Sequence, residues 1–238
     1  MLTLNLPQDL QALRDEFAVD NRINIASIWH PASCDLLEQT LRQQTTFDHA
    51  IVNEGKALSI PDQVLRELPA AEKQRIQQQL WQGAADGFGF YYGTHRIDRP
   101  QPSPTTPPLL QQVHQLLNSD AVLAAVRQIS GFDDICYASA QATRYSSGHF
   151  LTRHSDVVAQ EGRRVAYVFG FTKEWHPDWG GLLQFFSEDG QSKDSWTPSF
   201  NNLAMFDVRH PHSVTYITPF AKASRYSITG WFRANPPA

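Results

Sequence analysis

The chain has 238 residues, of which 41% are hydrophobic and 11% aromatic, and its 20 basic and 24 acidic side chains give a formal net charge of −4. A chain of this length buries roughly 70–75% of its unfolded surface, which is enough for one large core. The charge gives no reason to expect a nucleic-acid or membrane partner, so we expect a small-molecule or peptide substrate.

The cysteine content and the first residues indicate where the protein works. Only two cysteines occur, Cys34 and Cys136, and they are too few and too far apart for a disulfide framework. Residues 1–7 contain no basic residue before their apolar positions, and no apolar run is long enough to span a membrane. We therefore expect a cytoplasmic protein.

Helix and strand patterns alternate over the first 85 residues. In chain order they predict a helix at 9–17, a strand at 22–29, a helix after Pro31 that ends at 43–46, a strand at 47–53 and a helix at 70–85. Ser33 is the expected N-cap of the second helix, because its hydroxyl can accept a hydrogen bond from a backbone N–H of the first turn.

Glycines and prolines then divide the chain. Aromatic residues between glycines at 87–93 fit either a strand packed on the core or a lid that forms a wall of the substrate site. Five prolines at 100–108 predict a stiff, extended surface loop within one domain. The next predicted helices cover 109–117 and 121–129.

Short strand-like runs dominate from residue 135 onward. They are rich in aromatic and β-branched residues and cover 137–145, 165–171, 182–186, 203–208, 214–217 and 226–232. Such spacing is typical of a sandwich or barrel. We expect a mainly β fold with flanking helices (α+β) in one domain over 1–238, in which residues 1–133 support a core formed by residues 134–238.

The candidate metal ligands lie in this second part. His154 and Asp156 are two residues apart, so on extended backbone both side chains point the same way and can reach one ion. His212 is the preferred third ligand. Three other histidines are alternatives to it: His210, His149 and His176. Two imidazoles and one carboxylate are the facial ligand set of non-haem Fe(II) oxygenases.

Arg225 begins a strand whose other residues are apolar or small. A lone arginine in such a place needs an anion, and its planar guanidinium suits a bidentate carboxylate. That carboxylate can belong to a cosubstrate or to an Asp or Glu of the protein itself. Ser227 faces the same side of the strand and can add a hydrogen bond to the cosubstrate.

Several motifs surround these residues in a specific order and spacing. They are Tyr145-x-x-Gly148-x-Phe150-x-x-x-His154-x-Asp156, Arg163, Lys173-Glu174-Trp175, Gly180-Gly181-Leu182-Leu183, Pro198-Ser199-Phe200-Asn201-Asn202-Leu203, Pro211-His212-Ser213-Val214 and Ser224-Arg225-Tyr226-Ser227-Ile228-Thr229-Gly230-Trp231-Phe232. From about residue 140 onward, this pattern resembles the prolyl 4-hydroxylase branch of the Fe(II)/2-oxoglutarate dioxygenases. The resemblance implies a double-stranded β-helix, or jelly roll, with helices packed outside its larger sheet.

The resemblance also implies roles for five residues. His154, Asp156 and His212 would bind Fe(II). Arg225 would pair with the distal carboxylate of 2-oxoglutarate, and Tyr145 would hydrogen-bond the same group. Taken without the resemblance, Tyr145 also fits a core aromatic residue.

Three further positions concern the substrate and the cosubstrate pocket. Trp231 and Arg163 match positions near the substrate in relatives, although Trp231 also fits the core. Gly170 departs from the pattern, because oxygen-sensing relatives carry a tyrosine there, so the pocket is either roomier or filled from elsewhere. O2 would be the second cosubstrate and ascorbate an accessory reductant, and no catalytic group is expected beyond the metal ligands.

The leading functional hypothesis is hydroxylation of an aliphatic C–H group, as in a prolyl residue of a protein or peptide. The first alternative is hydroxylation of a free amino acid or small metabolite, and the second is a non-catalytic, metal-binding jelly-roll sensor. Asp156 argues against a radical halogenase, in which a small residue replaces the carboxylate.

Overall fold

In the computed structural model, which describes residues 2–53, 55–99 and 103–236, six helices surround one sheet of thirteen antiparallel strands. The helices are α1 (Leu10–Asp20), α2 (Pro31–Gln43), α3 (Asp62–Glu67), α4 (Ala70–Ala85), α5 (Pro108–Leu117) and α6 (Asp120–Ser130). The strands are β1 (Arg22–Ala26), β2 (Asp48–Asn53), β3 (Lys56–Ile60), β4 (Phe90–Arg96), β5 (Tyr137–Ala138), β6 (Gln141–Tyr145), β7 (Phe150–His154), β8 (Arg163–Phe171), β9 (Leu183–Phe186), β10 (Ser192–Trp196), β11 (Phe200–Asp207), β12 (His212–Val214) and β13 (Arg225–Arg233).

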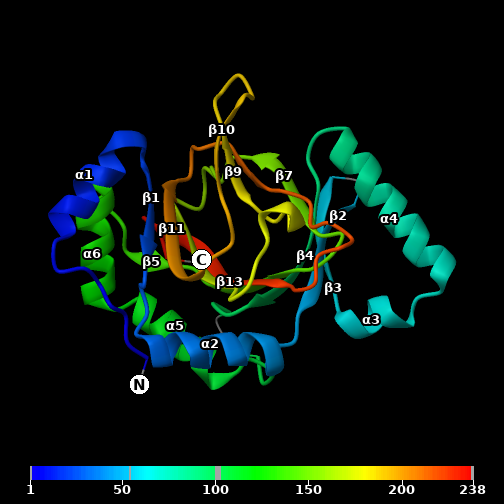
Figure 1. Ribbon diagram of the computed structural model, residues 1–238, viewed down its shortest axis with the longest axis horizontal. Coiled ribbons are helices and arrows are strands. Elements are labelled where there is room, and N and C mark those ends of the chain that lie inside the picture. The colour runs from blue at the N-terminus through cyan, green and yellow to red at the C-terminus, as the bar shows by residue number, and fades with distance from the viewer. Residues whose placement is uncertain (1, 54, 100–102, 237–238) are drawn as a thin grey trace.

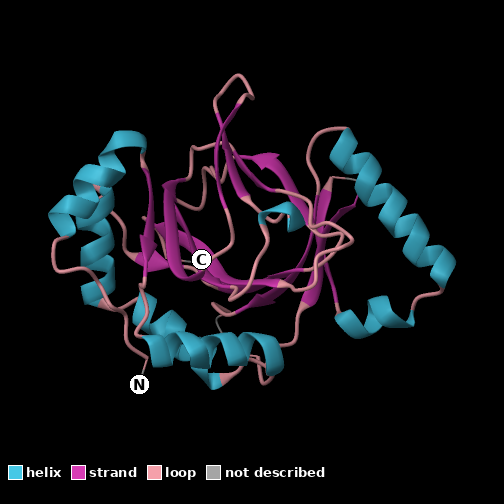
Figure 2. Cartoon of the chain, viewed as in Figure 1, coloured by secondary structure: helices cyan, strands magenta, loops and turns pink. Residues whose placement is uncertain are grey.

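The strand order confirms the expected mainly β fold with a jelly-roll core. Neighbouring strands follow the order β1-β11-β8-β13-β6-β4-β7-β12-β9-β10, so strands far apart in sequence are paired throughout. Figures 1 and 2 show a strongly curved sheet, with β7 and β9 on the side opposite β13. Side chains from both sides of the curved sheet line one cavity.

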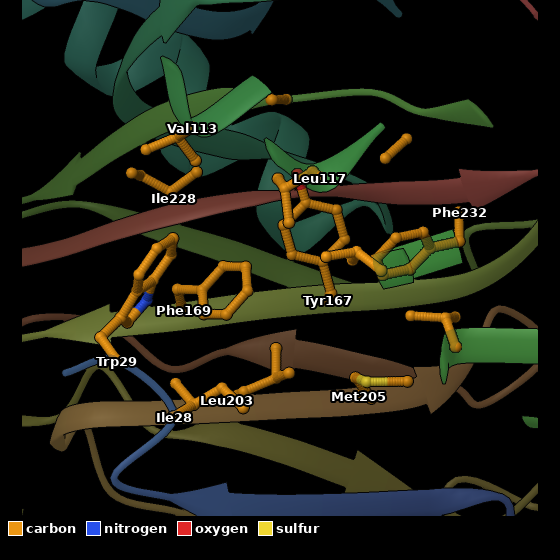
Figure 3. Close-up of a cluster of buried hydrophobic side chains, with 14 of the residues drawn as sticks. Ile28, Trp29, Val113, Leu117, Tyr167, Phe169, Leu203, Met205, Ile228 and Phe232 are labelled. Atoms are coloured by element: carbon orange, nitrogen blue, oxygen red, sulfur yellow. The ribbon is translucent and has the colours of Figure 1, made fainter. Parts of the chain in front are cut away.

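The two faces of β8 and β13 carry different residues, because successive side chains of a strand point to opposite faces. Tyr167, Phe169, Ile228 and Phe232 point to the outer face, where they are buried against helices (Figure 3). Val113 of α5 joins the same cluster. The inner face of both strands is therefore free to line a site.

Helices cover the sheet in two groups (Figure 1). The first group, α1, α2, α5 and α6, contributes to the large core that contains Phe17, Leu41, Leu117 and Ile129. The second group, α3 and α4, packs on β2 and β4 at the other end of the sheet. The helices therefore buttress the sheet as expected. None of the helices that the structure describes is long and apolar enough to cross a membrane.

Some expected element boundaries were wrong. Helix α2 begins at Pro31 with His30 as its N-cap residue, whereas the hydroxyl of Ser33 accepts a hydrogen bond from the backbone N–H of Thr3. The strand expected over 137–145 is interrupted after Ala138, because the Ser139 carbonyl accepts a hydrogen bond from the hydroxyl of Tyr167. Interactions with distant segments set these boundaries.

Two other differences concern the strands. The strand expected over 214–217 ends at Val214, beyond which Thr215 and Ile217 donate to the carbonyls of Leu182 and His149. Strands β3 and β10 were not predicted. Their residues are mostly exposed, so they lack the alternation of apolar and polar positions that marks a half-buried strand. Of the proline-rich segment, residues 100–102 lie outside the described residues.

Candidate functional site

Three potential metal ligands converge on the inner face of the sheet. His154 ends β7, Asp156 follows it in a loop, and His212 begins β12, where its backbone is paired with that of His154. The Asp156 carboxylate lies 3.4 Å from Nε2 of His154 and 3.6 Å from Nε2 of His212. One ligand atom from each residue lies within 4.8 Å of the others, so the three side chains could hold one metal ion.

Hydrogen bonds orient both imidazoles for metal binding. Nδ1 of His154 lies 2.9 Å from the Thr152 carbonyl, and Nδ1 of His212 lies 2.9 Å from the His210 carbonyl. Because a carbonyl can only accept, each Nδ1 carries the proton and each Nε2 keeps its lone pair toward Asp156. The three residues thus present the donor set that Fe(II) requires.

The protonation states suit a divalent cation. Burial alone would raise the pKa of Asp156, but the hydrogen bond with His154 and the charges of His212 and His154 hold it at about 2. Burial lowers the pKa of His212 to about 4. Near neutral pH the carboxylate is therefore ionised and the His212 imidazole is neutral, as metal binding demands.

Arg225 lies on the same inner face and has no anionic partner in the described part of the chain. Its side chain is buried, and Nη1 donates to the carbonyl of Gly181 at 3.0 Å. Among the described residues, no carboxylate lies within 4.0 Å of its guanidinium, which excludes the alternative of an ion pair with the protein's own Asp or Glu. Burial lowers the pKa of Arg225, which means that the buried cation destabilises the fold. A bound anion would offset this destabilisation.

One cavity joins the three candidate ligands to Arg225. Its volume is about 410 Å³, and both groups of residues line it. Tyr145 and Ser227 line it too, and the register pairs Tyr145 directly with Arg225 across β6 and β13. Tyr145 also stacks on Tyr92 with ring centroids 5.1 Å apart, so it is a buried aromatic residue and a cavity residue at once.

Comparison with known proteins finds similarity in the segment that contains the site. Residues 140–233 match the family model of the 2OG-Fe(II) oxygenase superfamily. This segment is about two fifths of the chain and is similar to the 2OG-Fe(II) oxygenases. The matched segment contains all three candidate ligands and Arg225.

One curated relative is similar in sequence, and solved structures share the fold. The mouse prolyl 3-hydroxylase OGFOD1 is 31% identical over 116 residues, which are 46% of this chain and 21% of the mouse protein. This chain therefore spans about a fifth of that relative. A Pseudomonas putida prolyl-4-hydroxylase shares the fold with a TM-score of 0.59 at 22% identity, covering 95% of this chain and 100% of that one. A Burkholderia pseudomallei oxidoreductase of the 2OG-Fe(II) oxygenase family gives 0.64 at 12% identity, covering 98% and 94%.

Arg163 and Trp231 lie beside Asp156. The Arg163 guanidinium lies 3.5 Å from the centre of the Trp231 ring and 2.9 Å from the Glu161 carboxylate, and its Nη1 lies 4.0 Å from the Asp156 carboxylate. Both side chains line the cavity. Trp231 is therefore a wall residue of the site rather than a residue of the large core.

A neighbouring strand fills the space beside Gly170. Gly170 of β8 is paired with Asn202 of β11, and a Cβ atom on Gly170 would lie 2.1 Å from Oδ1 of Asn202 and 2.3 Å from the Ser199 carbonyl oxygen. Of the two alternatives for this position, a pocket filled from elsewhere is therefore the one observed. A tyrosine has no room there.

Gly181 gives the first prediction. Its φ of +67° is unfavourable for other residues, and an added Cβ would lie 2.5 Å from Cδ1 of Ile217. Gly181→Ala is expected to lower the free energy of unfolding by about 2 kcal/mol, from backbone strain and overpacking, measured by urea unfolding. Gly83→Ala is the control, because its Cβ in α4 would meet no atom within 4 Å. An equal effect of both changes would contradict the argument.

The three alternative ligands lie elsewhere. Nε2 of His210 is 2.7 Å from the Asp20 carbonyl, and His176 is exposed beside Trp179. His149 is buried against Tyr91, with ring centroids 4.3 Å apart. His212 is therefore the histidine that the fold brings to His154 and Asp156.

His149 gives a pH prediction. Burial lowers its pKa to about 4, from an ordinary value of 6.5. Below pH 6.5 this histidine is protonated in the unfolded chain but not in the folded chain. The free energy of unfolding is therefore highest above that pH and falls as the pH drops toward 4. This loss amounts to about 2 kcal/mol between pH 7 and pH 5. Between pH 7 and pH 5 the free energy of unfolding of His149→Gln, measured with urea, is expected to fall by about 2 kcal/mol less than that of wild type. The same pH dependence in the variant and in wild type would contradict the assignment.

The segment at 87–93 was expected to be either a strand packed on the core or a lid that forms a wall of the substrate site. The aromatic segment between glycines contributes Phe88, Phe90 and Tyr92 to the cavity, so β4 is at once a core strand and a wall. Phe88 is 48% exposed, and its ring centroid lies 5.8 Å from that of His154. The hydroxyl and backbone of Thr152 hold the two glycines beside it. Gln141, which the sequence did not single out, also lines the cavity.

Proposed function

We propose that this protein is an Fe(II)- and 2-oxoglutarate-dependent dioxygenase that hydroxylates an aliphatic C–H group of a prolyl residue in a protein or peptide. The observation that carries the proposal is one cavity that contains both a two-histidine, one-carboxylate cluster and a buried arginine without an anion. The family match over residues 140–233 and the mouse prolyl 3-hydroxylase relative support it.

In this proposal His154, Asp156 and His212 hold Fe(II) through Nε2, a carboxylate oxygen and Nε2. Arg225 binds the distal carboxylate of 2-oxoglutarate, since its fork-shaped guanidinium suits two parallel hydrogen bonds. Tyr145, which is paired with Arg225, and Ser227, two residues further along β13, add hydroxyl donors.

When bound, iron and 2-oxoglutarate supply the oxidising power, and the overall reaction converts C–H, O2 and 2-oxoglutarate into C–OH, succinate and CO2. The chain contributes position and a dry environment. Leu183, Val214 and Phe206 line the cavity beside the candidate ligands and limit the access of water. Phe88 offers a flat apolar surface to a substrate ring, and Trp231, one face of which is covered by Arg163, lines the same cavity.

We further propose that ascorbate keeps the metal reduced and that the protein works in the cytoplasm. Both cysteines are free thiols, with Cys34 buried and Cys136 exposed. A reducing compartment suits free thiols as well as Fe(II).

The proposal is tested first by ligand binding. Anaerobic addition of Fe(II) and 2-oxoglutarate together is expected to produce a visible absorption band that neither produces alone. Admission of air with a substrate should then yield succinate, with a gain of 16 Da on the substrate by mass spectrometry. Absence of the band would overturn the assignment of the site.

The same assay separates the alternative functions. Proline-containing peptides and free amino acids are incubated in parallel with the protein, Fe(II), 2-oxoglutarate and ascorbate. A product from free amino acids alone would replace the peptide hypothesis with the small-molecule one. Metal binding without succinate from any substrate would favour a non-catalytic sensor.

A further inference from the structure

A cavity on the outer side of the sheet is separate from the candidate site. The central cavity adjoins two others, of about 630 Å³ and about 150 Å³, and Gln141 lines all three. A further cavity, of about 320 Å³, shares no lining residue with any of them. Its walls come from β2, β3 and β4 and from the helices α3 and α4, at the end of the sheet far from α1 and α6 (Figure 1). A ligand in this outer cavity would therefore not meet the residues proposed to bind metal or 2-oxoglutarate.

The outer cavity and the central cavity lie on opposite faces of the same strand. Successive side chains of a strand point to opposite faces. In β4, Phe90 and Tyr92 line the central cavity, whereas Tyr91 lines the outer one. His49 and Ile51, which are two residues apart in β2, also line the outer cavity. The two cavities therefore share strand β4 but no side chain.

Loose packing of α3 and α4 leaves the outer cavity open. Helix α3 contains no buried residue, and α4 buries only Leu80. The apolar part of the wall consists of aliphatic side chains from β2, β3, α3 and α4, which are Ile51, Ile60, Leu65, Ile76 and Leu80. A cavity of this size with such a lining suits a small ligand that has an apolar body.

The charged part of the wall contains more positive than negative groups. Asp62, the one carboxylate among the lining residues, lies 2.6 Å from Nε of Arg66 and 3.0 Å from Nε2 of His49, so both its oxygens are engaged. Nζ of Lys73 donates to the Arg66 carbonyl at 2.7 Å, and no carboxylate of the described residues lies within 4.0 Å of it. Lys73 therefore brings a positive charge to the cavity that an anionic ligand can neutralise.

We infer that the outer cavity is a second binding site, for a small monocarboxylate with an apolar body, whose carboxylate pairs with Lys73 and whose body lies against the aliphatic wall. A dicarboxylate such as 2-oxoglutarate would place its second charge beside aliphatic side chains, which is unfavourable. The inference goes beyond the proposed function and does not depend on it, because none of the residues of the outer cavity lines the central one.

Calorimetric titration with octanoate tests this site. Octanoate should bind wild type and Arg225→Met with equal affinity, because the arginine of the central cavity takes no part. The neutral analogue 1-octanol should bind at least about ten-fold more weakly than octanoate, since it lacks the charge-assisted hydrogen bond. Absence of octanoate binding to wild type would overturn the inference. Binding that disappears in Arg225→Met would belong to the central cavity and would overturn it as well.

Variants of Lys73 test the charge. Lys73→Met keeps most of the apolar stem and is expected to bind octanoate at least about ten-fold more weakly than wild type, with unchanged affinity for 1-octanol. Lys73→Arg keeps the charge and should bind octanoate nearly as wild type does. Lys56→Met is the matched control, because Lys56 is also an exposed lysine of this region, at the start of β3, but lies outside the outer cavity. Wild-type octanoate affinity in Lys73→Met, or an equal loss in Lys56→Met, would overturn the inference.

Ile76→Trp tests the aliphatic wall. Ile76 is half-buried on α4, and a larger side chain there would occupy the space of the ligand. The variant is expected to lose binding of octanoate and of 1-octanol together, with its fold checked by circular dichroism. Wild-type affinity for both ligands in a folded Ile76→Trp would overturn the inference. Each of these outcomes leaves the dioxygenase proposal in place, since that proposal depends on the absorption band with Fe(II) and 2-oxoglutarate.

Discussion

Asp156→Ala is expected to abolish substrate hydroxylation and to weaken Fe(II) binding by at least ~100-fold, since even loss of a residue that only orients a metal ligand costs 10–100-fold. The carboxylate lies within 3.4 Å and 3.6 Å of the two candidate imidazoles, and its pKa of about 2 keeps it ionised. Without it, two neutral imidazoles remain, and they offer no negative charge to a divalent cation. Calorimetric titration with Fe(II) or Mn(II) under anaerobic conditions measures the loss.

Asp189→Asn is the control for this change. Asp189 is another aspartate, but it lies in the exposed turn between β9 and β10, hydrogen-bonded to Ser187. It should leave metal affinity and turnover at wild-type values. Retention of wild-type metal affinity by Asp156→Ala would remove the carboxylate from the ligand set and leave the site to another residue.

Arg225→Met is expected to have opposite effects on function and on stability. The requirement for 2-oxoglutarate should rise at least ~100-fold, because a bidentate pair of charge-assisted hydrogen bonds is lost. The free energy of unfolding of the ligand-free protein should rise by about 1 kcal/mol, because an apolar side chain of similar volume replaces a buried cation for which the described residues provide no anion. Loss of the hydrogen bond to the Gly181 carbonyl limits this increase in the free energy of unfolding.

Thermal unfolding with and without 2-oxoglutarate measures both effects. The wild-type protein should gain stability from 2-oxoglutarate in the presence of Mn(II), and Arg225→Met should gain none at the same concentration. Arg164→Met is the control, because Arg164 is paired with Asp134 on the surface and such a pair contributes at most about 1 kcal/mol. Strong destabilisation of ligand-free Arg225→Met would mean that the protein already neutralises this charge.

The sequence alone was enough to predict that His154 and Asp156 point the same way. His154 and Asp156 are two residues apart, and the side-chain direction along extended backbone is a local property. Alternation in β8 and β13 likewise follows from a period of two residues, so the face that carries Arg225 and Ser227 could be inferred before any contact was known. The strong helical stripes of α5 and α6 are local in the same way.

Only the tertiary structure decided which distant groups meet. His210 and His212 lie on the same side of their segment, and the choice between them depends on the Asp20 carbonyl, which engages His210. Strand pairing across the sheet determines three further features. They are the absence of an anion near Arg225 among the described residues, the Asn202 side chain beside Gly170, and the position of Gln141 where three cavities meet. Periodicity in one segment carries no information on the register between segments, because register depends on how whole faces pack together.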